Sequence, residues 1–184
     1  MEAILVPMIA NPDRPLPRSM FIPGMRHTVM VGVVSQDKGF AVIKPIRDPT
    51  GHVWIPPQGP VGHKRSLFDA GRHVLREEIP SLQRPHRHGA PIIDWESAIY
   101  AGSAINEHAR SGRCKMVHVV LFRAKIARLP VLRSNGSDCV AAQWVFSNEM
   151  LQYVLQATQY TNPTKAHIVM EAAWTAKEIG WLHR

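Results

Sequence analysis

The sequence is poor in cysteine, with only Cys114 and Cys139 in 184 residues. They form neither a CxxC pair nor a Cys/His finger spacing, so no zinc-finger signature is present. The glycine-rich loops G-x-G-x-x-G and G-x-x-x-x-G-K-[ST] are also missing, and these are the usual signatures of dinucleotide and P-loop phosphate binding. We expect two reduced thiols in or near strands.

Long apolar runs are absent as well. No stretch approaches the roughly 18 to 20 residues that a membrane span needs. Residues 1–15 lack the positive start and the long apolar stretch of a secretory signal. With 45% apolar residues, the chain can bury a core. These features predict a soluble, cytoplasmic protein with no membrane partner.

Positive charge is in excess. Lys and Arg total 22 against 14 Asp and Glu, with ten His besides, which gives a formal net charge of +8. An excess of this kind favours polyanionic partners such as RNA, DNA or phosphorylated small molecules. The charge is spread along the chain rather than gathered in a tail, so an ordinary basic surface remains the alternative.

The first 25 residues contain five prolines, which remove backbone donors and disfavour helix. We expect an irregular arm there. Beyond it, β-rich runs bounded by turn residues predict strands. The expected strands are residues 27–34, 40–45, 53–55, 92–103, 116–126 and 141–145. The segment 92–103 is either a strand pair or one long bent strand, and residues 106–113 are expected to be a polar turn region.

A helix is predicted over residues 66–79. Ser66 can cap it with Asp69 three residues later, and apolar residues recur at helical spacing. Gly71 in its middle suggests close packing on a sheet, and Pro80 stops it. Two further helices are expected, one from about residue 148 to 155 and one from about 163 to 179.

The order of strands, helix, strands and helix predicts an α+β fold, an α/β/α sandwich with a mixed sheet. It lacks the regular βαβ alternation of a doubly wound fold. We expect a proline-rich arm at residues 1–25, one domain at 26–160, and a C-terminal helix at 161–184 that packs on the domain.

Residues 54–59 read WIPPQG and lead into the helix that ends in Glu77 and Glu78. This strand, loop and helix resemble the signature region of the Nudix (MutT-like) superfamily. The family pattern is Gly, five residues, Glu, seven residues, then Arg-Glu-apolar-x-Glu-Glu-x-Gly-apolar. The lead-in is similar to that of bacterial RNA pyrophosphohydrolases. Residues 141–155, AAQWVFSNEMLQYVL, resemble the closing strand and helix of many Nudix domains.

The match to the Nudix box is incomplete. With Gly59 as the first glycine, Glu77 and Glu78 take the final glutamate pair. Four positions of the pattern that carry a charge or a glycine hold other residues, namely Arg65 for the first Glu, His73 for the Arg, Val74 for the next Glu and Pro80 for the last Gly. Arg65 and His73 cannot form the ion pair that commonly braces the loop on the helix. Val74 removes one carboxylate from the helix face on which i, i+3 and i+4 positions meet.

The resemblance implies Mg²⁺ or Mn²⁺ bound by Glu77, Glu78 and the backbone carbonyl near Gly59. Such ions neutralise phosphate oxygens and activate water, and Mg²⁺ prefers carboxylate oxygens. It also implies an acidic general base on a separate loop, for which Asp138 and Glu107 are the candidates. The catalytic set predicted in this way is Glu77, Glu78 and Asp138.

Basic residues surround the expected phosphate site. Lys64, Arg65, Arg72 and Arg76 are predicted to contact substrate phosphates, with a solvated helix face as the alternative. Trp54 can stack on a base or pack in the core. Other groupings stay open. Asp69, His73 and Glu77 form one helical stripe that could hold a metal with nitrogen ligation, and His86 and His88 could bind phosphate or metal.

Two functions follow from the resemblance. The first is a divergent Nudix-type hydrolase that cleaves a nucleoside diphosphate-linked substrate, a nucleotide or an RNA 5′ end, with a divalent metal. The second is a catalytically impaired Nudix-fold module that binds RNA, a nucleotide or a protein complex. The retained Glu77 and Glu78 favour the first, and Val74 favours the second.

Overall fold

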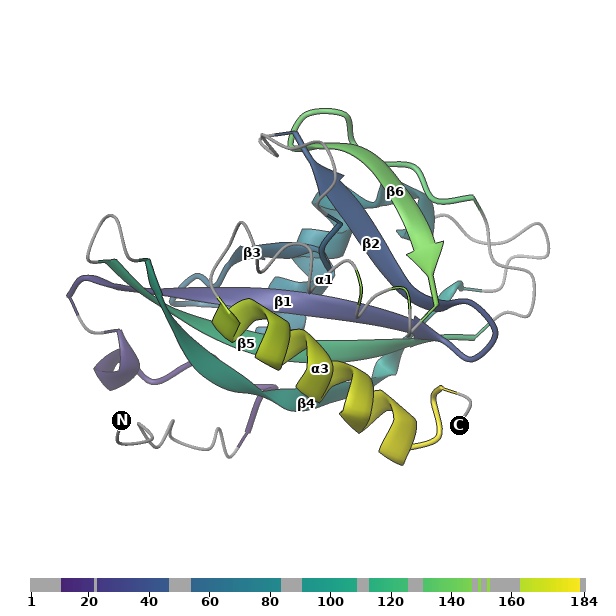
Figure 1. Ribbon diagram of the computed structural model, residues 1–184. Helices are drawn as coiled ribbons and strands as arrows, with labels where there is room; N and C mark the ends of the chain where they lie inside the picture. The colour runs from purple at the N-terminus through teal and green to yellow at the C-terminus, as the bar shows by residue number, and fades with distance from the viewer. Residues whose placement is uncertain are drawn as a thin grey trace.

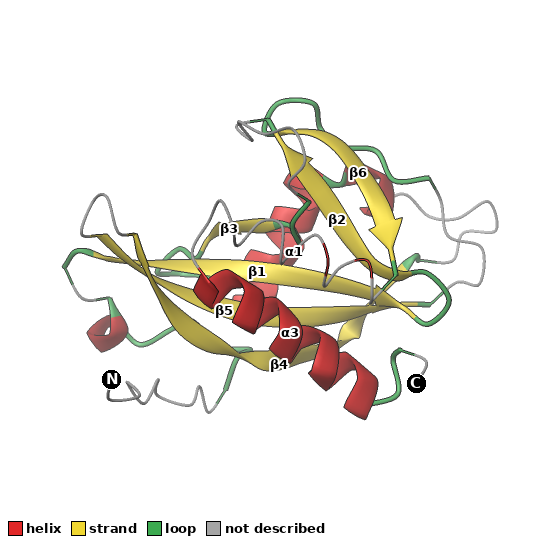
Figure 2. Ribbon diagram, in the orientation of Figure 1, coloured by secondary structure: helices red, strands yellow, loops and turns green. Residues whose placement is uncertain are grey.

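The structure, a computed structural model, is built around one six-stranded sheet with a helix on each face (Figures 1 and 2). Ten elements are defined, in chain order: η1 (Arg18–Met20), β1 (Met25–Ser35), β2 (Gly39–Pro45), β3 (Gln58–Pro60), α1 (Leu67–Glu78), η2 (Pro80–Gln83), β4 (Ile93–His108), β5 (Arg113–Ala124), β6 (Cys139–Val145) and α3 (Pro163–Glu178). The structure describes residues 11–21, 23–46, 54–83, 91–108, 113–125, 131–146, 149, 152 and 163–182.

The sheet is mixed, as the sequence predicts. Its strand order is β4-β5-β1-β2-β6, and β3 pairs separately with β1. Strands β1 and β5 run parallel over ten residue pairs, from Met25↔Cys114 to Val34↔Arg123. The other pairings are antiparallel. Strand β1 is therefore the central element, with β5, β2 and β3 as its hydrogen-bonded neighbours.

Two cores lie on opposite faces of the sheet. Side chains from α1 pack on one face, against Val31, Val120 and Phe122 among others. Side chains from α3 pack on the other face, with Val119 and Leu121 among the residues beneath them. This alternation along β5 is the period-2 pattern of a strand buried on both faces. The α/β/α sandwich and the α+β class are confirmed (Figure 1).

Helix α1 begins as its sequence predicts. The Ser66 hydroxyl oxygen accepts a hydrogen bond from the Asp69 backbone N–H at 3.0 Å, which satisfies one of the free donors at the helix start. Gly71 faces the sheet, where a Cβ would lie 2.8 Å from Val120 Cγ2 and 3.2 Å from Phe122 Cε2. The glycine therefore permits the close approach of helix and sheet.

The segment before α1 differs from the prediction. The expected strand at residues 53–55 is represented in the described residues by an isolated bridge between Ile55 and Ile43. The expected turn at Pro56 to Gly59 instead enters strand β3, which is antiparallel to β1 with Val29 opposite Gly59. The Pro57 carbonyl also accepts a hydrogen bond from Val31 N–H at 2.8 Å. Proline lacks an N–H but keeps its carbonyl, so it can still accept from the neighbouring strand.

The long hairpin of β4 and β5 also extends further than predicted. Strand β4 is one strand with register shifts between Asp94 and Ile99 and between Tyr100 and Gly102, which selects the bent-strand alternative. It continues to His108, into the segment expected to be a turn. The expected helix at 148–155 and the loop with His86 and His88 lie largely or wholly outside the described residues. None of the helices that the structure describes is long and apolar enough to cross a membrane.

Candidate active site

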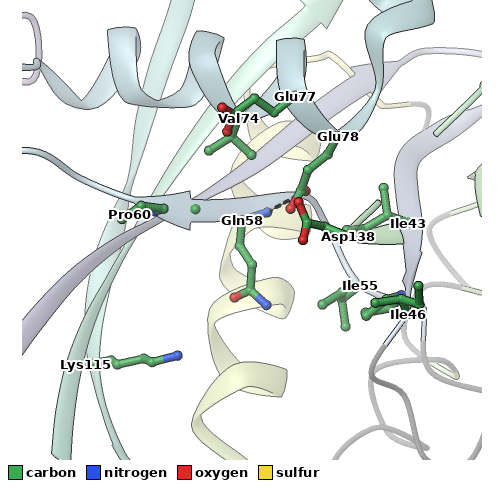
Figure 3. Close-up of a pocket in the computed structure, with 12 residues that line it drawn as sticks. Ile43, Ile46, Ile55, Gln58, Pro60, Val74, Glu77, Glu78, Lys115 and Asp138 are labelled. Atoms are coloured by element: carbon green, nitrogen blue, oxygen red, sulfur yellow. Dashed lines mark hydrogen bonds between the residues drawn. The ribbon is translucent and has the colours of Figure 1, made fainter. Parts of the chain in front are cut away.

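A cavity of about 550 Å³ opens between the C-terminal end of α1, strand β3 and the loop before β6. Apolar side chains line part of it, Ile43, Ile46 and Ile55 among them. Its polar and charged lining residues are Gln58, Glu77, Glu78, Lys115 and Asp138. Figure 3 shows these side chains around the cavity. We call it the Glu78 cavity.

Glu78 is held in the cavity wall by the backbone of β3. Its Oε2 accepts a hydrogen bond from the Gln58 N–H at 3.1 Å. Burial raises the pKa of the Glu78 carboxyl from 4.5 to about 7, the hydrogen bond from Gln58 lowers it, and the negative charges of Asp138 and Glu77 raise it further. Burial disfavours the charged form of this carboxyl group. Binding of a proton or of a cation would therefore stabilise Glu78 in the cavity wall.

Asp138 reaches the same cavity from a loop far along the chain. The Asn135 side-chain oxygen accepts hydrogen bonds from the Ser137 N–H at 3.0 Å and the Asp138 N–H at 3.3 Å. The Asp138 carbonyl in turn accepts from the Ile46 N–H at 3.0 Å. These bonds fix the loop against the end of β2. Two carboxyl groups predicted as catalytic, Glu78 and Asp138, thus line one cavity.

Glu77 lies at the rim of the cavity and is partly engaged elsewhere. Its Oε1 is 3.2 Å from His73 Nε2, one helical turn earlier, and its side chain is 59% exposed. The position that holds Arg in the Nudix pattern therefore contacts the first glutamate of the final pair. Asp69, the third member of the possible metal stripe, is bonded instead to the Ser66 hydroxyl at 2.9 Å and to Arg72 at 2.9 Å.

Val74 stands where the Nudix pattern, in the register predicted from the sequence, has its second glutamate. It is 3% exposed, and its Cγ2 lies 2.6 Å from the position that a Cβ on Gly59 would take. Helix α1 thus contacts β3 through an apolar side chain at this position. The contact keeps the Gly59 backbone close to the helix, beside the two carboxylates.

Lys115 is a cavity residue that the sequence did not reveal. It lies on β5, paired in register with Arg26 of β1, and lines the cavity across from Glu78 in Figure 3. No local motif marks it, because it is brought to the site by the parallel pairing of strands distant in sequence. Lys115 adds a positive charge to the cavity, which carries Glu77 and Glu78 at the end of α1.

No protein-family model matches the chain, and no curated protein sequence matches it. Solved structures do. A Nudix hydrolase from Nitrosomonas europaea matches with a TM-score of 0.53 at 16% identity, over 80% of this chain and 87% of that one. The dihydroneopterin triphosphate pyrophosphohydrolase of E. coli matches with a TM-score of 0.55 at 12% identity, over 82% and 96%. A C. elegans Ap4A hydrolase matches with a TM-score of 0.52 at 13% identity, over 83% and 98%.

This is the Nudix fold. The resemblance drawn from WIPPQG and the Glu77-Glu78 helix is confirmed at the level of the fold. The register of the Nudix box on residues 59–81 stays a prediction. The Glu78 cavity lies at the end of α1, beside Glu77 and Glu78.

The basic residues predicted to bind phosphate lie outside the Glu78 cavity lining. Arg72 donates to Asp69 and to the Trp95 carbonyl, each at 2.9 Å, so it joins α1 to β4. Lys64, Arg65 and Arg76 are exposed. Their contact with a substrate stays a prediction.

Two further candidates are placed as follows. Trp54 is half-buried against the core on the α3 side of the sheet, which agrees with the packing alternative, and its stacking on a base stays a prediction. Glu107, the other candidate for a general base, pairs with Cys114 in the β4–β5 hairpin, and its side chain lies outside the described residues.

The cavity donors fit a divalent cation. Mg²⁺ is usually held in proteins by one or two carboxylates together with water and substrate phosphates, and Glu78 and Asp138 supply two carboxylates. A bound cation would offset the burial and the repulsion that raise the Glu78 pKa. In the part of the chain that the structure describes, no group of three or more His, Cys, Asp or Glu side chains is placed to hold a metal. The fit therefore rests on two carboxylates.

Proposed function

We propose that the protein is a divalent-cation-dependent hydrolase of a nucleoside diphosphate-linked substrate, a nucleotide or an RNA 5′ end. The observation that carries this proposal is the pair of carboxyl groups, Glu78 and Asp138, which share one cavity and interact electrostatically. The apolar wall formed by Ile43, Ile46 and Ile55 gives the same cavity a surface for an uncharged part of the ligand.

In this proposal Glu78 and Lys115 each have one role, and Asp138 has two. Glu78, positioned by the Gln58 N–H, would hold Mg²⁺ or Mn²⁺ together with Asp138. The cation supplies charge neutralisation at the phosphate and lowers the pKa of bound water. Lys115 pairs with a phosphate oxygen from the opposite wall.

Hydrolysis then requires one proton acceptor. Water forms a new P–O bond, the bridging P–O bond breaks, and the leaving phosphate takes the bond electrons. Asp138 accepts the proton of the attacking water, because it is the exposed and more accessible carboxylate of the pair. Glu107 remains the alternative acceptor.

The second candidate function is a Nudix-fold module that binds a nucleotide or RNA without cleaving it. The observation in its favour is the burial of Val74 against Gly59, which leaves the helix face with an apolar contact where the Nudix pattern has a carboxylate. The contact of Glu77 with His73 at 3.2 Å also holds the Glu77 side chain on the helix surface.

One experiment separates the two functions. The protein is incubated with Mg²⁺ or Mn²⁺ and a panel of nucleoside diphosphate derivatives and 5′-triphosphorylated RNA, alongside Glu78→Gln, Asp138→Asn and Glu77→Gln. The hydrolase predicts turnover that falls at least about 100-fold in the first two variants, as for the loss of an essential group, and less in Glu77→Gln. Salt-dependent binding of the same probes without any product would establish the binding module instead.

A further inference from the structure

A second cavity of about 580 Å³ lies next to the Glu78 cavity, along β3. It is lined by residues of the N-terminal segment, β1 and the loop before α1, which include Phe21, Arg26, His27 and His63. We call it the Phe21 cavity. It shares Gln58, Gly59, Pro60 and Lys115 with the Glu78 cavity, so the two cavities adjoin along a common wall.

Two cations of the Phe21 cavity stand next to each other, and no carboxylate of the described residues forms a salt bridge with either. Arg26 and Lys115 are paired in register on the parallel strands β1 and β5, and both line this cavity. Like charges on neighbouring strands repel. An anionic ligand between Arg26 and Lys115 would offset the repulsion between their positive charges.

An aromatic surface stands beside the cations. The rings of Phe21 and His63 have their centroids 4.0 Å apart, and Phe21 also contacts His27 at 4.7 Å. Phe21 is half-buried and His63 is exposed. Aromatic side chains beside a positive groove are the elements that bind the bases and phosphates of nucleotides.

The segment that carries Phe21 is fixed to the sheet by buried histidines. His27 Nε2 lies 2.9 Å from the Met20 carbonyl, and His27 Nδ1 lies 2.9 Å from His118 Nε2. The carbonyl can only accept, so His27 donates from Nε2. In its neutral form it then accepts at Nδ1 from His118. This chain of bonds places Phe21 at the cavity.

We propose that the Phe21 cavity binds a second nucleoside of the substrate, linked through phosphate to the diphosphate in the Glu78 cavity. The base contacts Phe21 and His63, and the linking phosphate contacts Arg26 and Lys115. Both cavities are lined by Gln58, Gly59, Pro60 and Lys115, so a single polyphosphate or phosphodiester linkage along these shared residues joins the two. This inference rests on the proposed function and narrows its substrate to molecules with two nucleosides.

The test compares probes that differ by one nucleoside. Binding to the Glu78→Gln variant is measured by titration calorimetry for diadenosine tetraphosphate against adenosine tetraphosphate, and for 5′-triphosphorylated ApA against ATP. The inference predicts that the second adenosine improves Kd by about 5- to 100-fold in at least one pair, as for one stacked base. The pair that shows the gain identifies a dinucleoside polyphosphate or an RNA end as the source of the second nucleoside.

Substitutions in the Phe21 cavity test whether the improvement in Kd from the second adenosine arises there. Phe21→Ala and Arg26→Gln are expected to reduce the ratio of the two Kd values to near one, while Phe146→Ala and Arg123→Gln preserve it. The controls are exposed residues of the same types that line neither cavity, and Arg123 lies at the far end of the β1–β5 pair from Arg26. Phe21→Leu serves if thermal unfolding shows that Phe21→Ala is not folded.

The outcomes distinguish this inference from the proposed function. Equal Kd values within both probe pairs, or a gain that survives Phe21→Leu and Arg26→Gln, would overturn the second subsite even if the wild-type protein hydrolyses the probes. A gain that these variants remove, without hydrolysis by the wild-type protein, would sustain the subsite and overturn the hydrolase.

Discussion

The Cγ2 methyl of Val74 lies 2.6 Å from the point where a Cβ on Gly59 would stand. Helix α1 and strand β3 therefore meet at a contact that admits only glycine on the strand side without some movement. Both residues line the Glu78 cavity. The contact sets the separation between the carboxylates at the end of the helix and the backbone of β3.

Gly59→Ala is expected to destabilise the fold by about 1–3 kcal/mol, as for an overpacked core site. Gly62→Ala is the matched control, because a Cβ there meets nothing within 4 Å. Denaturant unfolding measures both changes. In the double variant with Val74→Ala, the loss at Gly59 should shrink through a favourable coupling energy. Equal stabilities of the two alanine variants would show that the contact does not constrain the fold.

Val74→Glu places a carboxylate beside Glu78 at a position that is 3% exposed. In chelator, we expect a loss of about 3–5 kcal/mol, because a buried charge is left unpaired. Added Mg²⁺ or Mn²⁺ should restore more stability than it does in the wild-type protein, since binding to the folded state stabilises it. Val74→Gln, of similar size and without charge, should lose stability without gaining the response to metal. Identical responses of the two variants would contradict a cation site at this end of α1.

Glu78→Gln tests the raised pKa of this carboxyl in metal-free protein. The folded state keeps the Glu78 proton up to about pH 7, whereas the ordinary value is 4.5. The stability contributed by this group is therefore greatest below pH 4.5 and declines as the pH rises through that window. At pH 8, Glu78→Gln should be more stable than the wild type by up to about 3 kcal/mol, with the gain gone near pH 4.

Glu77→Gln is the control for that measurement. Its carboxyl is exposed, so the change should stay within about 0.5 kcal/mol across the same pH range. Unfolding free energies measured in chelator between pH 4 and pH 8 decide the matter. A Glu78→Gln gain independent of pH would mean that the effect comes from packing rather than from ionisation.

His118→Gln tests the opposite pH dependence. Burial and the neighbouring His27 lower the pKa of His118 from 6.5 to about 3, and the side chain is 0% exposed. Because the unfolded chain takes up a proton at this group below pH 6.5 and the folded state does not, stability is lost as the pH falls. At pH 5 this loss is about 2 kcal/mol.

A glutamine can donate from its side-chain nitrogen to His27 Nδ1, as His118 Nε2 does, yet it does not titrate. Relative to pH 7.5, the variant should therefore lose about 2 kcal/mol less than the wild type at pH 5. Chemical unfolding at the two pH values provides the measurement. Parallel losses in the two proteins would assign the acid sensitivity to other groups.

Much of the fold follows from local sequence. Ser66 and Asp69 specify the start of α1 by capping, and Gly71 indicates the close contact with the sheet that Val120 and Phe122 confirm. Strand β3 was missed because Pro56 and Pro57 read locally as a stop. Its pairing with β1, with Val29 opposite Gly59, joins segments distant in sequence, which no local pattern reports.

The candidate site likewise contains residues that the sequence predicts and features that only the packing of distant segments produces. Glu78 was predicted because the Nudix pattern has a glutamate pair at the end of its helix, and Asp138 was named because the resemblance implies an acidic general base on a separate loop. Their shared cavity depends on how β6 and α1 pack, which lies beyond any single segment. Lys115 carries no motif at all, since only the register of β5 against β1 brings it to the cavity.

Strand β1 contributes Arg26 and His27 to the Phe21 cavity and holds β3, the wall common to both cavities. The strands on both sides of β1 are hydrogen-bonded to it. Strand β1 therefore supports the walls of both cavities. A deformation of β1 would displace both walls together. If β1 keeps its shape, the spacing between the two cavities is fixed. That spacing would limit the length of the linkage in a ligand that occupies both cavities.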